Sequence, residues 1–377
     1  TAAVQMGSPI RLNSEEGGVI NNSHDFAMNK AFSGTVLTKR GAGWLKTYAS
    51  GASLNRMVIA AGTVQNGSGV AAKVVELQGG SLIDNVGTGN EINIPAGKKG
   101  SWTTGNRQTY TNTITGGGTI TIYCATEKGS GWYATRTPLR LNTSSFEGTI
   151  VPQATYAEDG RFTLDIALGL AKGGMNIPDG IIVQNSGKTS TIGKIQGTGS
   201  LGGGCAFSNG VTVGTNTWKI GNDDDYKWEG KAIDNSILVK VGAGKITASG
   251  KSTNSGATRI DEGQMHITAT ATLGTGALNV GVNGKLSGAS STTVTLTNSS
   301  VTVNGEVQPG MTDESATGFL DFGNKNVTFN TSSTLRFGIR RCATARNNGC
   351  ASIIGINRLT MNETLVAFLD DSYTSAE

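Results

Sequence analysis

Short β-prone runs alternate with glycine and asparagine turns along most of this chain, and they lack the 3.6-residue apolar period of an amphipathic helix. The pattern is clearest over Leu238–Gly310. It is strictest over Thr119–Tyr123, where Ile120 and Ile122 fall on one face of a strand. We therefore expect an all-β protein. Over Phe162–Leu168, where the apolar residues also fit a short helix, nearby glycines favour a strand.

One unit of this pattern occurs twice. The first copy contains LTKRGAGWL (Leu37–Leu45) and VIAAGTV (Val58–Val64), and the second begins at Leu238. A duplicated unit of short strands and turns predicts a fold in which each coil stacks on the previous one. The copies align without a gap, so that Leu37, Lys39, Gly41, Ala42, Gly43, Ile59 and Gly62 match Leu238, Lys240, Gly242, Ala243, Gly244, Ile260 and Gly263.

The motif Leu-x-Lys-x-Gly-Ala-Gly-x-Leu resembles the autotransporter-associated β-strand repeat of bacterial secreted passenger proteins. Leu273–Gly288 and Val301–Gly310 resemble the downstream turns of that repeat. The resemblance covers residues 238–310 and 32–65. It implies a right-handed parallel β-helix, a single-stranded solenoid with loop excursions, on a surface or secreted protein. It implies no catalytic activity.

We expect one continuous β-helix over residues 1–377, with residues 1–31 as an N-terminal segment that covers the first open coil. Modules begin at three aromatic-x-Gly motifs, whose aromatic side chains we expect to be interior: Phe32, Phe146 and Trp228. Residues 95–113 are polar, and we expect a loop there.

An antiparallel sandwich is the alternative fold, because Asn-Gly turns typical of hairpins occur five times, as at Asn283-Gly284. The repeat favours the parallel β-helix. In that fold backbone groups pair from coil to coil, and Asn and Thr at equivalent turns form ladders.

Composition agrees with a turn-rich β fold. The 377 residues include 56 Gly and 6 Pro, and only 15% are charged. The net charge of +4 is mild, so we expect no nucleic-acid partner. The chain has no apolar run of about 18 residues, so we expect no membrane-spanning helix. Because the chain starts at Thr1 without a signal pattern, we expect an export signal to have been removed.

The four cysteines allow one local disulfide. Cys342 and Cys350 are eight residues apart across an Asn-Asn-Gly turn, which favours a bridge in an oxidising compartment. Cys124 and Cys205 can pair only if stacking brings them together. The alternative is that both are small buried side chains.

The acidic cluster Asp223, Asp224 and Asp225 offers oxygen ligands of the kind that Ca²⁺ prefers. Consecutive residues of a strand face opposite ways, however, so a loop would have to gather them. A solvated turn is the favoured interpretation. We therefore expect no cofactor, with Ca²⁺ as the alternative.

A basic stretch without acidic residues runs from Arg336 to Arg358 and contains Arg340, Arg341 and Arg346. Rigidly held arginines bind carboxylate, sulfate or phosphate groups bidentately, so this stretch is a candidate glycan-binding surface. A solvated loop is the favoured interpretation, because runs of charge usually are solvated.

No spacing singles out a catalytic set. We therefore expect a non-enzymatic exported protein, a stalk or adhesive surface of a bacterial cell, whose partners are polysaccharides, host-surface glycans or host proteins. It would lie outside the cell or on the cell surface. The alternative is a carbohydrate-active β-helix enzyme such as a polysaccharide lyase, which rests on analogy of fold and on Asp223–Asp225.

Overall fold

The computed structural model describes residues 4–6, 10–12, 17–30, 32–48, 53–66, 71–84, 90–104, 111–124, 141–154, 161–164, 168–185, 187–203, 214–288, 293–309, 319–339 and 352–370. These residues form strands and turns and no helix. Their strands pair in parallel, each with a strand of the previous or the next coil. The predicted all-β parallel β-helix is thus confirmed, and the antiparallel sandwich is excluded.

The chain divides into two compact units, described here one at a time. The first unit comprises Thr1–Ser186 and Cys205–Val213. Its strands are β1 (Val4–Met6), β2 (Ile10–Leu12), β3 (Gly18–Asn21), β4 (Phe26–Met28), β5 (Phe32–Arg40), β6 (Trp44–Thr47), β7 (Ser53–Ile59), β8 (Thr63–Asn66), β9 (Ala71–Leu77), β10 (Ser81–Asp84), β11 (Glu91–Ile94), β12 (Lys99–Thr104), β13 (Thr113–Gly116), β14 (Thr119–Cys124), β15 (Thr149–Ala154), β16 (Arg161–Leu164), β17 (Gly169–Asn176) and β18 (Ile182–Asn185).

The second unit comprises Gly187–Gly204 and Gly214–Glu377. Its strands are β19 (Thr189–Gln196), β20 (Ser200–Leu201), β21 (Thr217–Ile220), β22 (Tyr226–Trp228), β23 (Lys231–Ala232), β24 (Ile237–Lys240), β25 (Lys245–Ala248), β26 (Lys251–Ser252), β27 (Thr258–Ile267), β28 (Thr272–Leu273), β29 (Leu278–Gly288), β30 (Thr293–Thr295), β31 (Val301–Val303), β32 (Glu306–Gln308), β33 (Phe319–Phe329), β34 (Thr334–Ile339), β35 (Ser352–Met361) and β36 (Leu365–Asp370).

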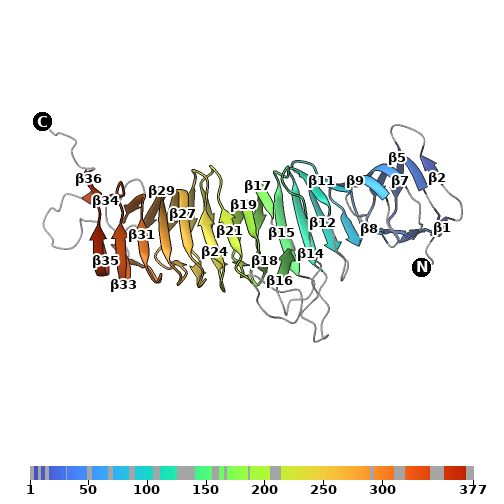
Figure 1. Cartoon of the computed structure of the whole chain (residues 1–377). Coiled ribbons are helices and arrows are strands. Elements are labelled where there is room, and N and C mark those ends of the chain that lie inside the picture. The colour runs from blue at the N-terminus through green and yellow to red at the C-terminus, as the bar shows by residue number, and fades with distance from the viewer. Residues whose placement is uncertain are drawn as a thin grey trace, which may run out of the picture. The chain divides into compact units, whose positions relative to one another are not determined.

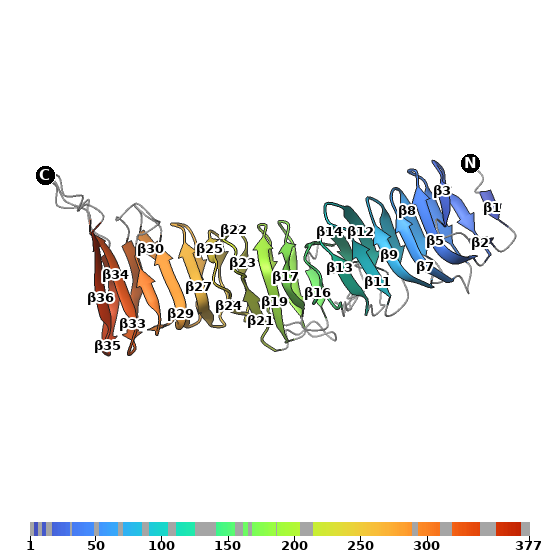
Figure 2. The same cartoon turned by 90° about the horizontal axis from the view of Figure 1, so that it is seen from above.

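In the first unit, successive strands from β4 to β14 alternate between two sheets (Figures 1 and 2). One sheet stacks β5, β7, β9, β11 and β13, and the other stacks β4, β6, β8, β10, β12 and β14. Each coil therefore adds one strand to each sheet, and the apolar side chains between the sheets form continuous columns. One column, in register from coil to coil and at most 2% exposed, consists of Leu45, Val64, Leu82, Trp102 and Ile122.

The burial of Trp102 corrects one expectation from the sequence. Residues 95–113 were expected to form a polar loop, but Lys99–Thr104 is strand β12, and Trp102 is fully buried in the column. The outward positions of this strand are polar, and Thr104 is buried on the same side as Trp102, so a single large aromatic residue marks the inward face.

In the second unit, one strand often covers two strands of the previous coil. Thr258–Ile260 of β27 pairs with β24, and Gln264–Ile267 pairs with β25. Strands β27 and β29 then pair along most of their lengths, with a register shift between Ile260 and Glu262. The corresponding interior column, at most 6% exposed, consists of Ile246, Met265, Leu286, Val307 and Leu335.

Three further expectations have outcomes in the described residues. Strand structure is confirmed at Arg161–Leu164, and Gly169–Asn176 forms a second strand, β17, despite its glycines. The aromatic residues of the three aromatic-x-Gly motifs are buried. An asparagine ladder is present, since Asn330 Nδ2 donates a 2.9 Å hydrogen bond to Asn304 Oδ1 of the previous coil.

Candidate functional site

The duplicated turn holds a buried lysine in both units. Lys240 is the last residue of β24, and its side chain is fully buried beneath the Gly-Ala-Gly turn. Its Nζ atom donates hydrogen bonds to the carbonyl oxygens of Val241 (2.8 Å), Gly242 (2.5 Å) and Glu262 (3.1 Å). Two of these carbonyls belong to its own turn, and the third belongs to the next coil. The lysine therefore ties two coils together at the corner.

Lys39, the matched residue of the first copy, has the same environment. It is fully buried, and its Nζ atom donates to the carbonyl oxygens of Arg40 (2.8 Å), Gly41 (2.7 Å) and Ala61 (3.3 Å). The sequence offsets of the three acceptors are the same in both copies. The match of Lys39 to Lys240 in sequence therefore reports one hydrogen-bonding unit that is used twice.

Burial changes the proton affinity of both amines. It lowers the pKa of Lys240 to about 8, against the opposing attraction of Glu262, Asp223 and Asp225. Burial also lowers the pKa of Lys39 below its ordinary value. A lysine with a lowered pKa can act as a base or a nucleophile in an open site, but here neither amine is exposed to solvent. Both serve as hydrogen-bond donors inside the turn.

The matched glycines of the two copies, Gly62 and Gly263, pack directly on the Gly-Ala-Gly turn of the previous coil. Gly263 has φ of +67°, and a Cβ atom there would lie 2.3 Å from the carbonyl oxygen of Gly242. Gly62 has φ of +70°, and its Cβ would lie 2.3 Å from the carbonyl oxygen of Gly41. Glycine is required at both positions because a left-handed backbone and a close approach of two coils coincide there.

The predicted acidic cluster lies on an exposed turn before β22, and its carboxylates have separate partners. Asp223 Oδ1 accepts from the backbone N–H of Ala243 at 3.0 Å, and Asp225 Oδ1 accepts from that of Lys245 at 2.7 Å. Asp224 Oδ2 accepts from the Asn222 side chain at 3.1 Å. Two of the three carboxylates thus pair with the backbone of the next coil. No group of His, Cys, Asp or Glu in the part of the chain that the structure describes is arranged to hold a metal ion.

The structure places two of the candidate arginines. Arg336, on β34, has its Nε 2.9 Å from Glu306 Oε2, and Lys285 Nζ lies 2.9 Å from Glu306 Oε1. This ion-pair chain joins β29, β32 and β34 on an outward face. Arg358, on β35, is exposed.

The remaining candidates lie outside the described residues: Arg340, Arg341, Arg346, Cys205, Cys342 and Cys350. Cys124 ends strand β14, and only its backbone position is described. The disulfide and the basic loop therefore stay predictions.

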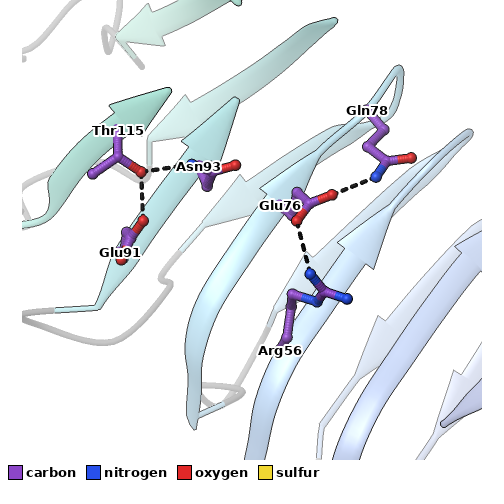
Figure 3. Close-up of polar contacts among 6 residues, drawn as sticks. All are labelled: Arg56, Glu76, Gln78, Glu91, Asn93 and Thr115. Atoms are coloured by element: carbon purple, nitrogen blue, oxygen red, sulfur yellow. Dashed lines mark hydrogen bonds and ion pairs between the residues drawn. The ribbon is translucent and has the colours of Figure 1, made fainter. Parts of the chain in front are cut away.

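A polar cluster that the sequence did not reveal lies on the outward face of β7, β9, β11 and β13 (Figure 3). Glu76 on β9 accepts a hydrogen bond from Gln78 and pairs with Arg56 of β7, whose Nη1 lies 3.4 Å from Glu76 Oε2. Glu76 is paired in register with Asn93 of β11, and Glu91 lies two residues earlier on that strand. Strand geometry therefore puts the Cα atoms of the two glutamates ~8 Å apart.

Glu91 has its own partner in the next coil. The Thr115 hydroxyl donates to Glu91, and Asn93 Nδ2 lies 2.7 Å from Thr115 Oγ1 (Figure 3). Carboxylate-pair chemistry on a glycosidic bond needs one carboxyl group protonated as an acid. The carboxylates of Glu76 and Glu91 are instead both engaged, Glu76 by Arg56 and Gln78 and Glu91 by Thr115. The cluster therefore fits hydrogen bonding between coils better than acid catalysis. Sequence inspection missed it because its members come from four separate strands.

No model of a known protein family matches the chain, and neither a curated protein nor a solved structure shows significant similarity to it. The described residues contain no helix that is long and apolar enough to cross a membrane.

Proposed function

We propose that this chain is a non-enzymatic exported protein that forms a stalk or adhesive surface of a bacterial cell. The observation that carries the proposal is the repeated lysine corner. Lys39 and Lys240, which have the lowered pKa values useful to an active site, are both buried and bonded to turn carbonyls. The chemistry of the repeat thus stabilises the stacking of coils.

The surface charges support the same conclusion. The carboxylates of Asp223 and Asp225 cap the backbone of a neighbouring turn, and Glu306 pairs with Lys285 and Arg336. These groups connect strands of different coils and do not converge on a common point. A body of stacked coils that is stabilised in this way needs no reaction centre.

The test is to express the full gene in its bacterium with an epitope tag inside this chain. We expect antibody to label intact cells, and deletion of the chain to reduce attachment to a surface or a host cell. Labelling only after the cells are broken would contradict the proposal. In this proposal anionic glycans bind the arginines of the basic stretch, Arg336, Arg340, Arg341 and Arg346. Alanine substitution at Arg340 and Arg341 would then weaken heparin binding.

A carbohydrate-active enzyme is the second candidate, and Glu76 and Glu91, which lie on adjacent strands, are the carboxylates that it would use. Its test is incubation of the purified chain with a panel of polysaccharides, followed by measurement of new reducing ends or unsaturated products. Product formation that Glu76→Gln with Glu91→Gln abolished would establish the enzyme and overturn the stalk.

A further inference from the structure

The second sheet of the first unit carries a row of small hydroxyl side chains on its outward face. Strands β8, β10, β12 and β14 are in parallel register, and the residues that flank the buried column point to solvent. One row across these strands consists of Thr63, Ser81, Ser101 and Thr121. We call this row the hydroxyl row.

The side chains of the hydroxyl row are short, and two of them bond to each other. Ser101 Oγ donates a 2.7 Å hydrogen bond to Ser81 Oγ, and all four residues are partly exposed. A row of hydroxyl groups that both donate and accept matches a ligand that carries hydroxyl groups at regular spacing.

Exposed aromatic side chains stand at both ends of this face. Trp44, on β6, is in register with Thr63 and extends the row by one strand, and it is 37% exposed. Tyr123, on β14, is also 37% exposed and lies two residues beyond Thr121. The strand spacing puts Trp44 and Tyr123 ~19 Å apart across the sheet, which is the length of a short run of linked sugar rings. Tyr48, 51% exposed, continues the outward side of β6.

The second copy of the repeat shows that the coil itself does not require these aromatics. The residues matched to Trp44, Lys46 and Tyr48 in the alignment are Lys245, Thr247 and Ser249. The inward residue is apolar in both copies, since Leu45 and Ile246 are fully buried. The stacking of coils therefore requires an apolar residue at the inward position and allows different residue types at the outward position. The aromatics of the first copy need another explanation, and ligand contact provides one.

The outward face that follows from Lys245 is charged. Lys245, Gln264, Lys285 and Glu306 are in register there, with ion pairs between Lys245 and Asp225 and between Lys285 and Glu306. Two faces built by the same repeat thus differ in chemistry, one ionic and one made of hydroxyl and aromatic groups.

The charge at the Trp44 end of the aromatic face is neutralised. Lys46 Nζ lies 2.9 Å from Asp25 Oδ2 and 5.5 Å from the ring centroid of Trp44. The pair orients the indole ring and balances the charge at the Trp44 end of the face, while Lys99 of β12, two residues before Ser101, is exposed at the edge of the row. The hydroxyl row and its aromatic side chains carry no charge themselves, so they favour a neutral ligand.

We propose that this face binds a neutral polysaccharide, whose sugar rings stack on Trp44 and Tyr123 while the hydroxyl row bonds to their hydroxyl groups. The apolar C–H face of a pyranose ring packs on an aromatic ring, as other apolar groups do. This inference rests on the proposed function and names its partner. It involves a surface other than the arginines of the second unit.

The test is binding of the purified 377-residue chain to cellulose, β-mannan, xylan and soluble β-glucan, with polygalacturonate as the anionic comparison. Pull-down and affinity electrophoresis measure the apparent dissociation constant. We expect at least one neutral polymer to bind more tightly than polygalacturonate. The variant Trp44→Lys with Tyr123→Thr should weaken that binding at least about tenfold.

The matched control is Lys245→Ala, which alters the outward residue of the second copy and should leave neutral-polymer binding unchanged. Circular dichroism and melting temperature show whether each variant folds, and Tyr48→Ser gives a milder variant if the double change unfolds the chain. Absence of binding to every neutral polymer, or equal binding by folded wild type and variant, would overturn the inference. In either case, surface labelling and attachment of intact cells would still decide the proposed function separately.

Discussion

The ammonium of Lys240 donates a 3.1 Å hydrogen bond to the carbonyl of Glu262, which lies 22 residues later in the next coil. Lys39 makes the corresponding contact with Ala61, also 22 residues later, at 3.3 Å. The buried amine therefore bonds across the same number of residues, to the same corner of the next coil, in both copies. A shorter or longer coil would bring a different carbonyl to that position.

Replacement of Lys240 by methionine removes the donor and keeps the side-chain length. Three buried carbonyl groups then lose their partner, and the relief of burying an amine offsets only part of that cost. We expect Lys240→Met to lower the free energy of unfolding by about 2 kcal/mol, measured by urea denaturation. Lys227→Met is the control, because the Lys227 side chain is 57% exposed, and it should change stability by less than about 0.5 kcal/mol. Equal effects of the two substitutions would contradict the structural role of Lys240.

The lowered pKa of Lys240 predicts how stability depends on pH. Between the folded pKa of about 8 and the ordinary value of 10.5, the unfolded chain keeps a proton that the folded chain has released. The free energy of unfolding therefore rises with pH in this window, by at most about 3 kcal/mol. Below pH 8 the contribution of Lys240 does not change with pH. The difference in melting temperature between wild type and Lys240→Met should grow from pH 7.5 to pH 9.5. A constant difference would show that the amine keeps its ordinary pKa, and a shrinking one that its pKa is raised; either would contradict the prediction.

The fold could be predicted from the sequence because the residues that repeat are those that make contacts between coils. Lys39 and Gly62 each match their counterparts, and both pairs are explained by packing on the Gly-Ala-Gly turn. Trp102 was misplaced because its strand is otherwise polar, and inward residues are recognisable only when several of them alternate. Each interior column takes only one residue from each coil, and residues so far apart in the sequence are a weaker signal than a long apolar run.

The surface clusters could not be predicted from the sequence, for a different reason. Glu76 and Glu91 become neighbours through the register of β9 on β11, and Trp44 meets Thr63 through that of β6 on β8. Coil length varies along the chain, so the separation of two residues does not reveal whether they lie side by side. Only the strand register supplies that information.

The turn carrying Asp223, Asp224 and Asp225 should be insensitive to calcium. Asp225 Oδ1 is engaged by the backbone N–H of Lys245, and its other carboxylate oxygen lies 3.6 Å from Lys245 Nζ. We expect neither millimolar Ca²⁺ nor a chelator to move the melting temperature. Asp225→Ala should lower the free energy of unfolding by about 1 kcal/mol, because the hydrogen bond to the next coil is lost, and Ca²⁺ should not alter this loss. Stabilisation by Ca²⁺ that vanished in Asp225→Ala would instead establish a metal site.

Gly263 tests the packing of one coil on another most directly. Alanine at this position must adopt φ near +67° and would bring its Cβ within 2.3 Å of the Gly242 carbonyl oxygen, so the two coils must move apart. Gly97 is the matched control, because its φ is +74° and a Cβ there meets no atom within 4 Å. Gly97→Ala therefore reports the backbone strain alone, about 1 kcal/mol. Gly263→Ala should cost at least about 2 kcal/mol more, the range typical of steric overpacking. Equal losses of stability in the two variants would mean that the coils are not in contact at this corner, and the lysine bridge from Lys240 to Glu262 could not form either.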